Sequence, residues 1–362
     1  FNAFNEYWQA LNPKGYLIVV AHYPGEAHRL VANIVKAFET RGVGPREAMQ
    51  HLVLIGRDSS PTIILRKTPF IMSDAETYYG MIRTLGHQGS TNFVPFISQH
   101  RIAYGDVGES LVQARPMINT SLYALSRGEV DLQTYIHRQK QNVSWISDDS
   151  PFFYQMSSSI PLEILIVMSV AALFVLSLSG AFMKCKEKWA VESRGAFINF
   201  IGIGFGFIVL EVAVIQKFIL FWGHQTMALA LLLALILVST GLGSYVSGYV
   251  SDDQRKLSIS LVMIPLLIGI FLVTAPGMLD NFEDAQAASK LVVTAGLISP
   301  LFFFLGFPFP TLLRMVKRRV GTRAFPWMIG INSFSTLLGG VVAVLTAMLF
   351  GYRYVFLQGA LV

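Results

Sequence analysis

Six long apolar segments fill the second half of the chain and constrain its fold more than any other feature. They cover about residues 161–183, 196–221, 227–250, 257–276, 291–313 and 326–350. Each has roughly the twenty apolar residues that a helix needs to cross a bilayer. Only 14% of the 362 residues are charged, against roughly a quarter in soluble proteins. The sequence therefore predicts an α-helical membrane bundle of six spans. The final residues, YRYVFLQGALV, give at most a partial seventh.

Positive charge is distributed unevenly between the loops of this bundle. The loops after the first, third and fifth segments carry Lys184, Lys186, Lys188, Arg194, Arg255, Lys256, Arg314, Lys317, Arg318, Arg319 and Arg323, whereas the other loops carry only Lys290 and Arg353. Cytoplasmic loops retain Lys and Arg. The eleven cations therefore predict a cytoplasmic side, and residues 1–158 are expected on the extracytoplasmic side. Because the positive charge follows the membrane topology, nucleic acid is not expected as a partner.

Small residues and prolines predict how the spans pack. The pairs or triplets at four-residue spacing are Gly202 and Gly206, then Thr240, Ser244 and Gly248, then Ser335 and Gly339. Such spacing lets two helices approach closely in lipid. The sequence LGFPFP at 305–310 predicts a break in the fifth span, because proline interrupts helical hydrogen bonding.

Five polar residues within or beside the spans are candidate functional residues: Glu211, Gln216, Lys217, His224 and Asn332. Glu211 lies near mid-span, where a carboxylate is costly unless it faces the bundle interior, is protonated or has a polar partner. Lys217 is six residues on, so it does not share a helix face with Glu211. Lys217 is expected to extend toward the interface, with Trp222 and His224 at headgroup level. Glu211 is either a structural anchor, with Asn332, Ser333 or Thr336 as uncharged partners, or a functional site.

Residues 1–158 have the composition of a soluble α/β domain, and residues 159–362 form the transmembrane domain. Helices are expected at 3–11, 25–41 and 73–86, with strands in YLIVVAHY, HLVLIG and PTIILRK. The 25–41 helix has an apolar face formed by Leu30, Ile34, Val35 and Phe38. This order of elements is typical of the second half of a doubly wound, Rossmann-like domain. Residues 87–146 are expected to be irregular.

No catalytic or metal-binding motif stands out. No Gly-rich phosphate loop precedes residue 15, and GIGFG at 202–206 lies inside a span, where it favours helix packing. The histidines, His87 and His100 among them, lack metal-ligand spacing and are expected to be surface or hydrogen-bonded residues. Asp148 and Asp149 are expected in a turn or cap. The single Cys185 excludes an internal disulfide.

Several segments occur in this order in one known family: FNEYWQALNPKGYLIVV, SDDSPFFYQM, GFGFIVLEVAVIQKFILFWGHQTMALALLL, STGLGSYVSG, LGFPFPTLLR and IGINSFSTLLGGVVAVLTAMLFGY. On these segments the chain resembles multi-spanning membrane proteins that carry a spermidine synthase-like domain of methyltransferase-type fold. The resemblance covers the C-terminal half of that domain and the membrane bundle. The chain is thus expected to be a fragment, or one product of a split protein.

Spermidine synthases transfer an aminopropyl group from decarboxylated S-adenosylmethionine to putrescine. Their Gly-rich nucleoside loop, acidic ribose contact and catalytic aspartate would all lie before Phe1. The resemblance therefore assigns no catalytic, cofactor-binding or metal-binding residue here. Decarboxylated S-adenosylmethionine is expected only if the missing half is supplied from outside the chain.

Three functions remain open from the sequence. The first is a docking or assembly subunit of a bacterial inner-membrane complex, with the lipid bilayer and other subunits as partners. The second is an aminopropyltransferase completed by another chain. The third is a small-solute or proton-coupled transporter, in which Glu211, Pro308, Pro310 and Asn332 line a polar path.

Overall fold

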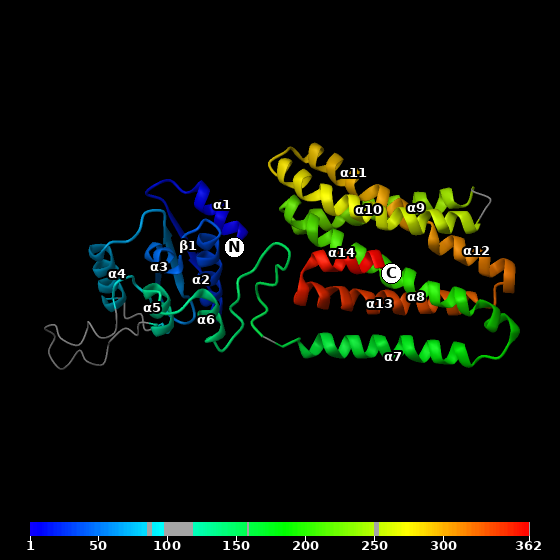
Figure 1. Ribbon diagram of the computed structural model, residues 1–362, viewed down its shortest axis with the longest axis horizontal. Coiled ribbons are helices and arrows are strands. Elements are labelled where there is room, and N and C mark those ends of the chain that lie inside the picture. Colours follow the sequence, from blue (N-terminus) through cyan, green and yellow to red (C-terminus); the bar gives the residue numbers. More distant parts are fainter. Residues whose placement is uncertain (85–88, 98–118, 158, 250–252, 362) are drawn as a thin grey trace. The chain divides into compact units, whose positions relative to one another are not determined.

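The computed structural model describes all residues except 85–88, 98–118, 158, 250–252 and 362. The chain forms two compact units, Phe1–Ser159 and Ile160–Val362 (Figure 1). Each unit has a hydrophobic core of its own.

The first unit contains short helices around a small sheet. Its elements are α1 (Asn2–Ala10), β1 (Tyr16–Val20), α2 (Pro24–Glu39), α3 (Pro45–Ala48), the 3-10 helix η1 (Met49–His51), β2 (Leu52–Ile55), β3 (Thr62–Arg66), α4 (Met72–Thr84), α5 (Thr120–Arg127) and α6 (Leu132–His137). The three expected helices and three expected strands are confirmed to within a few residues.

Residues 119–137 correct the expectation of an irregular stretch from 87 to 146. Two helices form there, and each begins with a side-chain cap: Asn119 accepts a hydrogen bond from the Leu122 amide at the start of α5, and Asp131 accepts one from the Thr134 amide at the start of α6. Asn and Asp are preferred at this position because they satisfy an otherwise unpaired helical amide. The capping residues were therefore visible in the sequence.

The sheet has the order β1-β3-β2, and β3 runs antiparallel to both neighbours. β1 and β2 consequently run in the same direction and are joined across the sheet by α2, as in an α/β unit. A doubly wound domain is mostly parallel, so the described strands depart from that expectation at β3. The cause is the short loop at 56–61, which can join β2 and β3 only as antiparallel neighbours.

The main core of this unit lies between α2 and one face of the sheet. The expected apolar face of α2 is confirmed, since Leu30, Ile34, Val35 and Phe38 are all buried. They pack with Leu52, Leu54, Ile63 and Leu65 of the sheet. On the other face, α4 covers β2 and β3 through a second cluster, formed by Val53, Ile64, Phe70, Ala75, Ile82, Val94 and Ile97.

Two of the histidines expected to be surface or hydrogen-bonded residues are buried and bonded. His28 Nδ1 lies 2.5 Å from the hydroxyl of Tyr135, which is fully buried. His51 Nδ1 lies 2.9 Å from the carbonyl oxygen of Arg66, and its ring packs between Trp8 and Phe38. His87 and His100 lie outside the described residues.

The buried His28 predicts that acid destabilises this unit. Burial lowers the pKa of His28 from 6.5 to about 4, so between these values the unfolded chain binds a proton that the folded chain does not. Stability is thus fully present above pH 6.5 and falls as the pH drops toward 4, by about 3 kcal/mol in total. Unfolding of the full chain, measured from pH 7.5 to 4, tests this. His28→Gln is expected to flatten the pH profile, and an equally steep profile in this variant would contradict the prediction.

Arg29 of α2 binds the chain segment that precedes the membrane unit. Its side chain is 2% exposed, and its guanidinium donates to the carbonyl oxygens of Asn142, Phe152, Phe153 and Gln155. The neighbouring Asn33 accepts from the Ile146 amide at 2.9 Å. α2 therefore holds residues 142–155 in place by hydrogen bonds to their main chain.

The second unit is a bundle of long apolar helices. They are α7 (Leu162–Lys184), α8 (Lys188–Trp222), α9 (Gln225–Ser247), α10 (Asp253–Asn281), α11 (Ala287–Leu305), α12 (Pro308–Val320), α13 (Phe325–Phe350) and α14 (Tyr352–Leu361) (Figure 1). In the described part of the chain, six stretches are long and apolar enough to cross a membrane, with α11 and α12 together forming one of them. All six predicted spans are confirmed. α8 and α10 extend farther than predicted, and α14 is a short helix whose buried face packs on α8.

The predicted break in the fifth span is confirmed. α11 ends at Leu305 and α12 begins at Pro308, so the helix is interrupted at Gly306 and Phe307. Pro308 lacks an amide hydrogen and is accommodated in the first turn of a new helix. The two helices differ in composition: α11 is apolar, whereas α12 has basic residues in its last turn.

Glycines bring pairs of spans into backbone contact, partly at other positions than predicted. Ser335 and Gly339 of α13 are buried as expected. On α8, Gly206 is buried as expected and Gly202 is half-buried. A further close contact is made by Gly204, where an added Cβ would overlap the Asn332 carbonyl oxygen. In membranes, such close approach takes the place of the hydrophobic effect in holding helices together.

The packing surface of α9 is wider than the predicted stripe of small residues. Ser239, Gly243 and Ser247 are buried, whereas Thr240 and Ser244 are half-buried and Gly248 is exposed. A Cβ at Gly243 would overlap the carbonyl oxygen of Phe303 on α11. A Cβ at Gly306, just after α11, would likewise overlap the Thr240 carbonyl oxygen and crowd the Ser244 amide nitrogen. The predicted stripe is therefore confirmed at Thr240 and Ser244, and the row through Gly243 adds a second close contact that was not predicted.

Candidate functional site

A groove between α8 and α12 gathers apolar and charged side chains at the basic end of the bundle. α12 is strongly amphipathic: Pro308, Thr311, Leu312 and Val316 are buried on one face, at helical spacing. Its last turn contains Lys317, Arg318 and Arg319, which suit the negative end of the helix dipole. The sequence thus places a basic helical turn at the end of a stretch that is long and apolar enough to cross a membrane.

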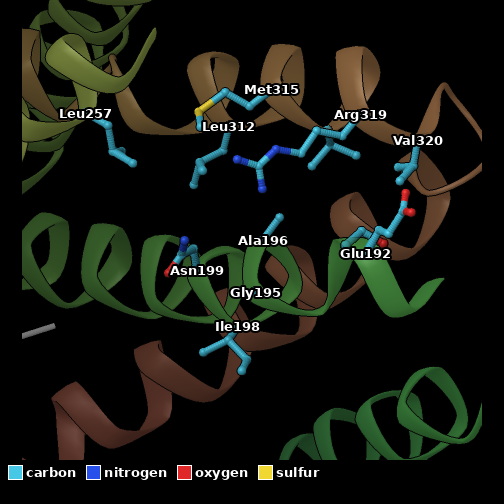
Figure 2. Close-up of a pocket in the computed structure, with 12 residues that line it drawn as sticks. Glu192, Gly195, Ala196, Ile198, Asn199, Leu257, Leu312, Met315, Arg319 and Val320 are labelled. Carbon is cyan, nitrogen blue, oxygen red and sulfur yellow. The ribbon is translucent and has the colours of Figure 1, made fainter. Parts of the chain in front are cut away.

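The groove has a volume of about 460 Å³ and polar as well as apolar walls. α8 contributes Glu192, Ser193, Gly195, Ala196, Ile198 and Asn199, and α12 and α10 contribute Leu257, Leu312, Met315, Val316, Arg319 and Val320. Figure 2 shows the Arg319 side chain running back along α12, with its guanidinium between the two helices near Leu312. This direction follows from the geometry of helices, whose side chains lean toward the N-terminus.

The cations of α12 differ in how they are neutralised. Asp253, at the start of α10, is 7% exposed and lies 2.8 Å from the Arg318 guanidinium and 3.8 Å from that of Arg314. Arg314 also donates to the carbonyl and hydroxyl oxygens of Ser247. The ion pairs join α10 to α12, and the hydrogen bonds join α12 to α9. For Arg319, by contrast, no hydrogen bond or ion pair occurs with any residue that the structure describes.

Glu192 stands at the outer end of the groove beside Val320 (Figure 2). Its carboxylate lies 3.8 Å from the Lys188 ammonium, one turn earlier on α8. The acidic side chain of the groove thus has a counter-ion outside it, and the positive charge that lines the groove is that of Arg319, which is exposed.

Glu211 is half-buried in α8, about 10 Å along the helix axis from Gly204 at 1.5 Å per residue. Gly204 marks the level at which α8 contacts Asn332. Within the described residues, no hydrogen bond joins Glu211 to Asn332, Ser333 or Thr336. The Ser333 and Thr336 hydroxyls donate instead to their own helix, to the carbonyls of Ile329 and Asn332. The structure therefore does not bring the proposed uncharged partners to Glu211.

The other polar candidates are dispersed. Gln216 and Lys217 are half-buried on α8, and the exposed His224 occupies the N-cap position of α9 without a capping hydrogen bond from its side chain. Asn332 Oδ1 and Ser335 Oγ are buried on α13 without a hydrogen-bond partner among the described residues. In the described structure these residues do not form one polar path with Glu211.

Two contacts at the far end of α8 were not predicted. Trp222 is buried within the bundle, and its indole donates to the Thr294 hydroxyl of α11 at 3.2 Å. Lys290 donates to the Phe221 carbonyl at 2.9 Å and lies over the Phe221 ring. Lys290 was one of the few cations on its side of the bundle, and this isolation is the signal that could have marked it as a helix cap.

The outer edge of β1 is a second candidate site. The Ala21 amide donates to the Pro61 carbonyl, and the Lys67 amide donates to the Gly15 carbonyl. The main-chain hydrogen bonds to β3 are therefore made by the odd-numbered residues of β1. The main-chain groups of Tyr16, Ile18 and Val20 therefore point away from β3, and no described strand pairs with them. Their side chains are also 50%, 60% and 60% exposed.

Among the described residues, no three acidic, histidine or cysteine side chains lie close enough together to form a candidate metal centre. Asp148 accepts a hydrogen bond from the Asn2 side chain, and the Ser150 amide bonds to the Ser147 carbonyl in a turn. These contacts accord with the turn expected at residues 147–150.

Comparisons with known proteins found no matching family model, no curated relative and no similar solved structure. The membrane bundle and the three-stranded sheet thus rest on the structure itself, and no comparison supports a spermidine synthase-like domain.

Proposed function

We propose that this chain is a docking or assembly component of a bacterial inner-membrane complex. Its bundle anchors it in the bilayer, and its Phe1–Ser159 unit contacts another subunit on the extracytoplasmic side. The proposal assigns no catalytic residue and no cofactor to this chain.

The open edge of β1 carries this proposal. Exposed main-chain groups on an edge strand are a template for another extended segment, and proteins usually protect them with charge, proline or a covering element. β1 instead presents the apolar residues Tyr16, Ile18 and Val20. Main-chain bonds from an added strand would supply affinity, and pockets for alternate side chains would supply selectivity. The partner is therefore an extended segment with apolar side chains.

A lysine at Ile18 tests the proposal. Ile18→Lys is expected to reduce the complex isolated from native membranes to the size of the single chain, because a charge would be desolvated at the strand interface. Ile71→Lys is the matched control, since Ile71 is 62% exposed but lies outside β1. In the intact complex, the amides of Tyr16, Ile18 and Val20 are expected to be protected from hydrogen exchange. Equal loss of the complex in both variants, or fast exchange of these amides in the complex, would contradict the proposal.

The alternative of an aminopropyltransferase uses the same edge. Strands of a nucleotide-binding half, contributed by another chain, would extend the sheet at β1 and complete a site for polyamine chemistry. Binding of decarboxylated S-adenosylmethionine to the isolated complex separates the two functions. Transport receives less support. Asn332 of α13 meets α8 at Gly204, about two helical turns from Glu211.

A further inference from the structure

We propose that the groove between α8 and α12 binds the headgroup of an anionic phospholipid, with its phosphate on Arg319. This site is independent of the docking role of β1. It would make the bundle selective for acidic lipids at its basic end.

The position of Arg319 carries the first step of this inference. The guanidinium reaches from the basic last turn of α12 toward Leu312, into a groove with apolar walls (Figure 2). The described residues give it no acceptor, whereas Arg314 and Arg318 of the same helix share Asp253. A guanidinium in such surroundings favours an anion with oxygen acceptors, and phosphate matches its forked donors.

The second step concerns the chemistry of the walls. Asn199 lines the α8 side of the groove and offers an amide for glycerol or ester oxygens, while Leu312, Met315 and Leu257 offer apolar surface. A free inorganic phosphate would leave this apolar surface uncovered. An amphiphile covers both parts of the groove, with its headgroup at Arg319 and an acyl chain along the apolar wall. Basic pockets between membrane helices are known to bind acidic lipid headgroups in this way.

Lipid retention by the full chain tests the site. The purified protein is equilibrated with an equal mixture of phosphatidylglycerol and phosphatidylcholine, and retained lipids are counted by native mass spectrometry. The wild type is expected to retain phosphatidylglycerol preferentially. Arg319→Gln is expected to lower that retention roughly tenfold, as loss of a charge-assisted hydrogen bond predicts. Lys317→Gln removes the same charge from a residue of α12 that is exposed, as Arg319 is, but does not line the groove, and it is expected to retain the lipid.

A second variant fills the groove without changing charge. A Cβ at Gly195 meets no atom within 4 Å, so Gly195→Leu is expected to fold and to displace the lipid. Gly180→Leu on α7 is its control, because that position is equally open and lies outside the groove. Wild-type retention in both Arg319→Gln and Gly195→Leu would overturn the proposal. So would equal loss in Lys317→Gln, or displacement of the lipid by excess inorganic phosphate, which would identify a free anion as the ligand.

Discussion

Replacing Gly243 by leucine is expected to destabilise the membrane unit by more than about 3 kcal/mol. A Cβ at this position would overlap the Phe303 carbonyl oxygen, and a main-chain atom within a helix cannot rotate away as a side chain can. Overpacking costs of 1–3 kcal/mol are usual where side chains can yield, so a clash with main chain is expected to exceed them. α9 would have to move away from α11 and lose the close packing that holds helices together in lipid.

Gly241→Leu is the matched control for this prediction. It makes the same replacement on the same helix, at a position where an added Cβ meets no atom within 4 Å. Heating the full chain in detergent and measuring the folded fraction by size-exclusion chromatography compares the two variants. Gly243→Leu is expected to lose its folded peak at a much lower temperature. Equal melting of the two variants would mean that α9 and α11 do not pack through Gly243.

The membrane half was predictable because its signals are local. Twenty apolar residues specify a span wherever they occur, and the prolines at 308 and 310 specify a break. The close contact through Gly243, one residue from the predicted row, was not predictable, because it depends on where the Phe303 main chain meets α9. Sequence spacing shows that a helix can pack closely, and only the partner helix shows on which face.

The groove shows the same limit for a functional site. In the sequence, Arg319 was one of eleven cations used to predict topology, and nothing separated it from Arg314 or Arg318. The distinction arises from Asp253, which begins a different helix and neutralises those two but not Arg319. Likewise, Glu211 was identifiable as a mid-span carboxylate, but whether Asn332 reaches it depends on the offset between α8 and α13.

Arg29→Ala is expected to lower the free energy of unfolding of the Phe1–Ser159 unit by about 3–5 kcal/mol. The guanidinium donates to four carbonyl oxygens that lie between 113 and 126 residues farther along the chain. Each buried acceptor left without a donor costs about 1–3 kcal/mol, and water that enters the vacated space recovers part of this. Because the acceptors are so distant in sequence, no local pattern distinguishes this arginine from an exposed one.

Arg127→Ala removes the same side chain from the surface and serves as the control. Its ion pair with Glu129 has both side chains about 60% exposed, and exposed pairs contribute less than about 1 kcal/mol. Thermal unfolding of the full chain and proteolysis within residues 142–155 measure the difference. Arg29→Ala is expected to expose that segment to cleavage under conditions in which Arg127→Ala and the wild type remain intact. If all three resist cleavage equally, the segment is held by its apolar contacts, and the hydrogen bonds of Arg29 contribute little to its order.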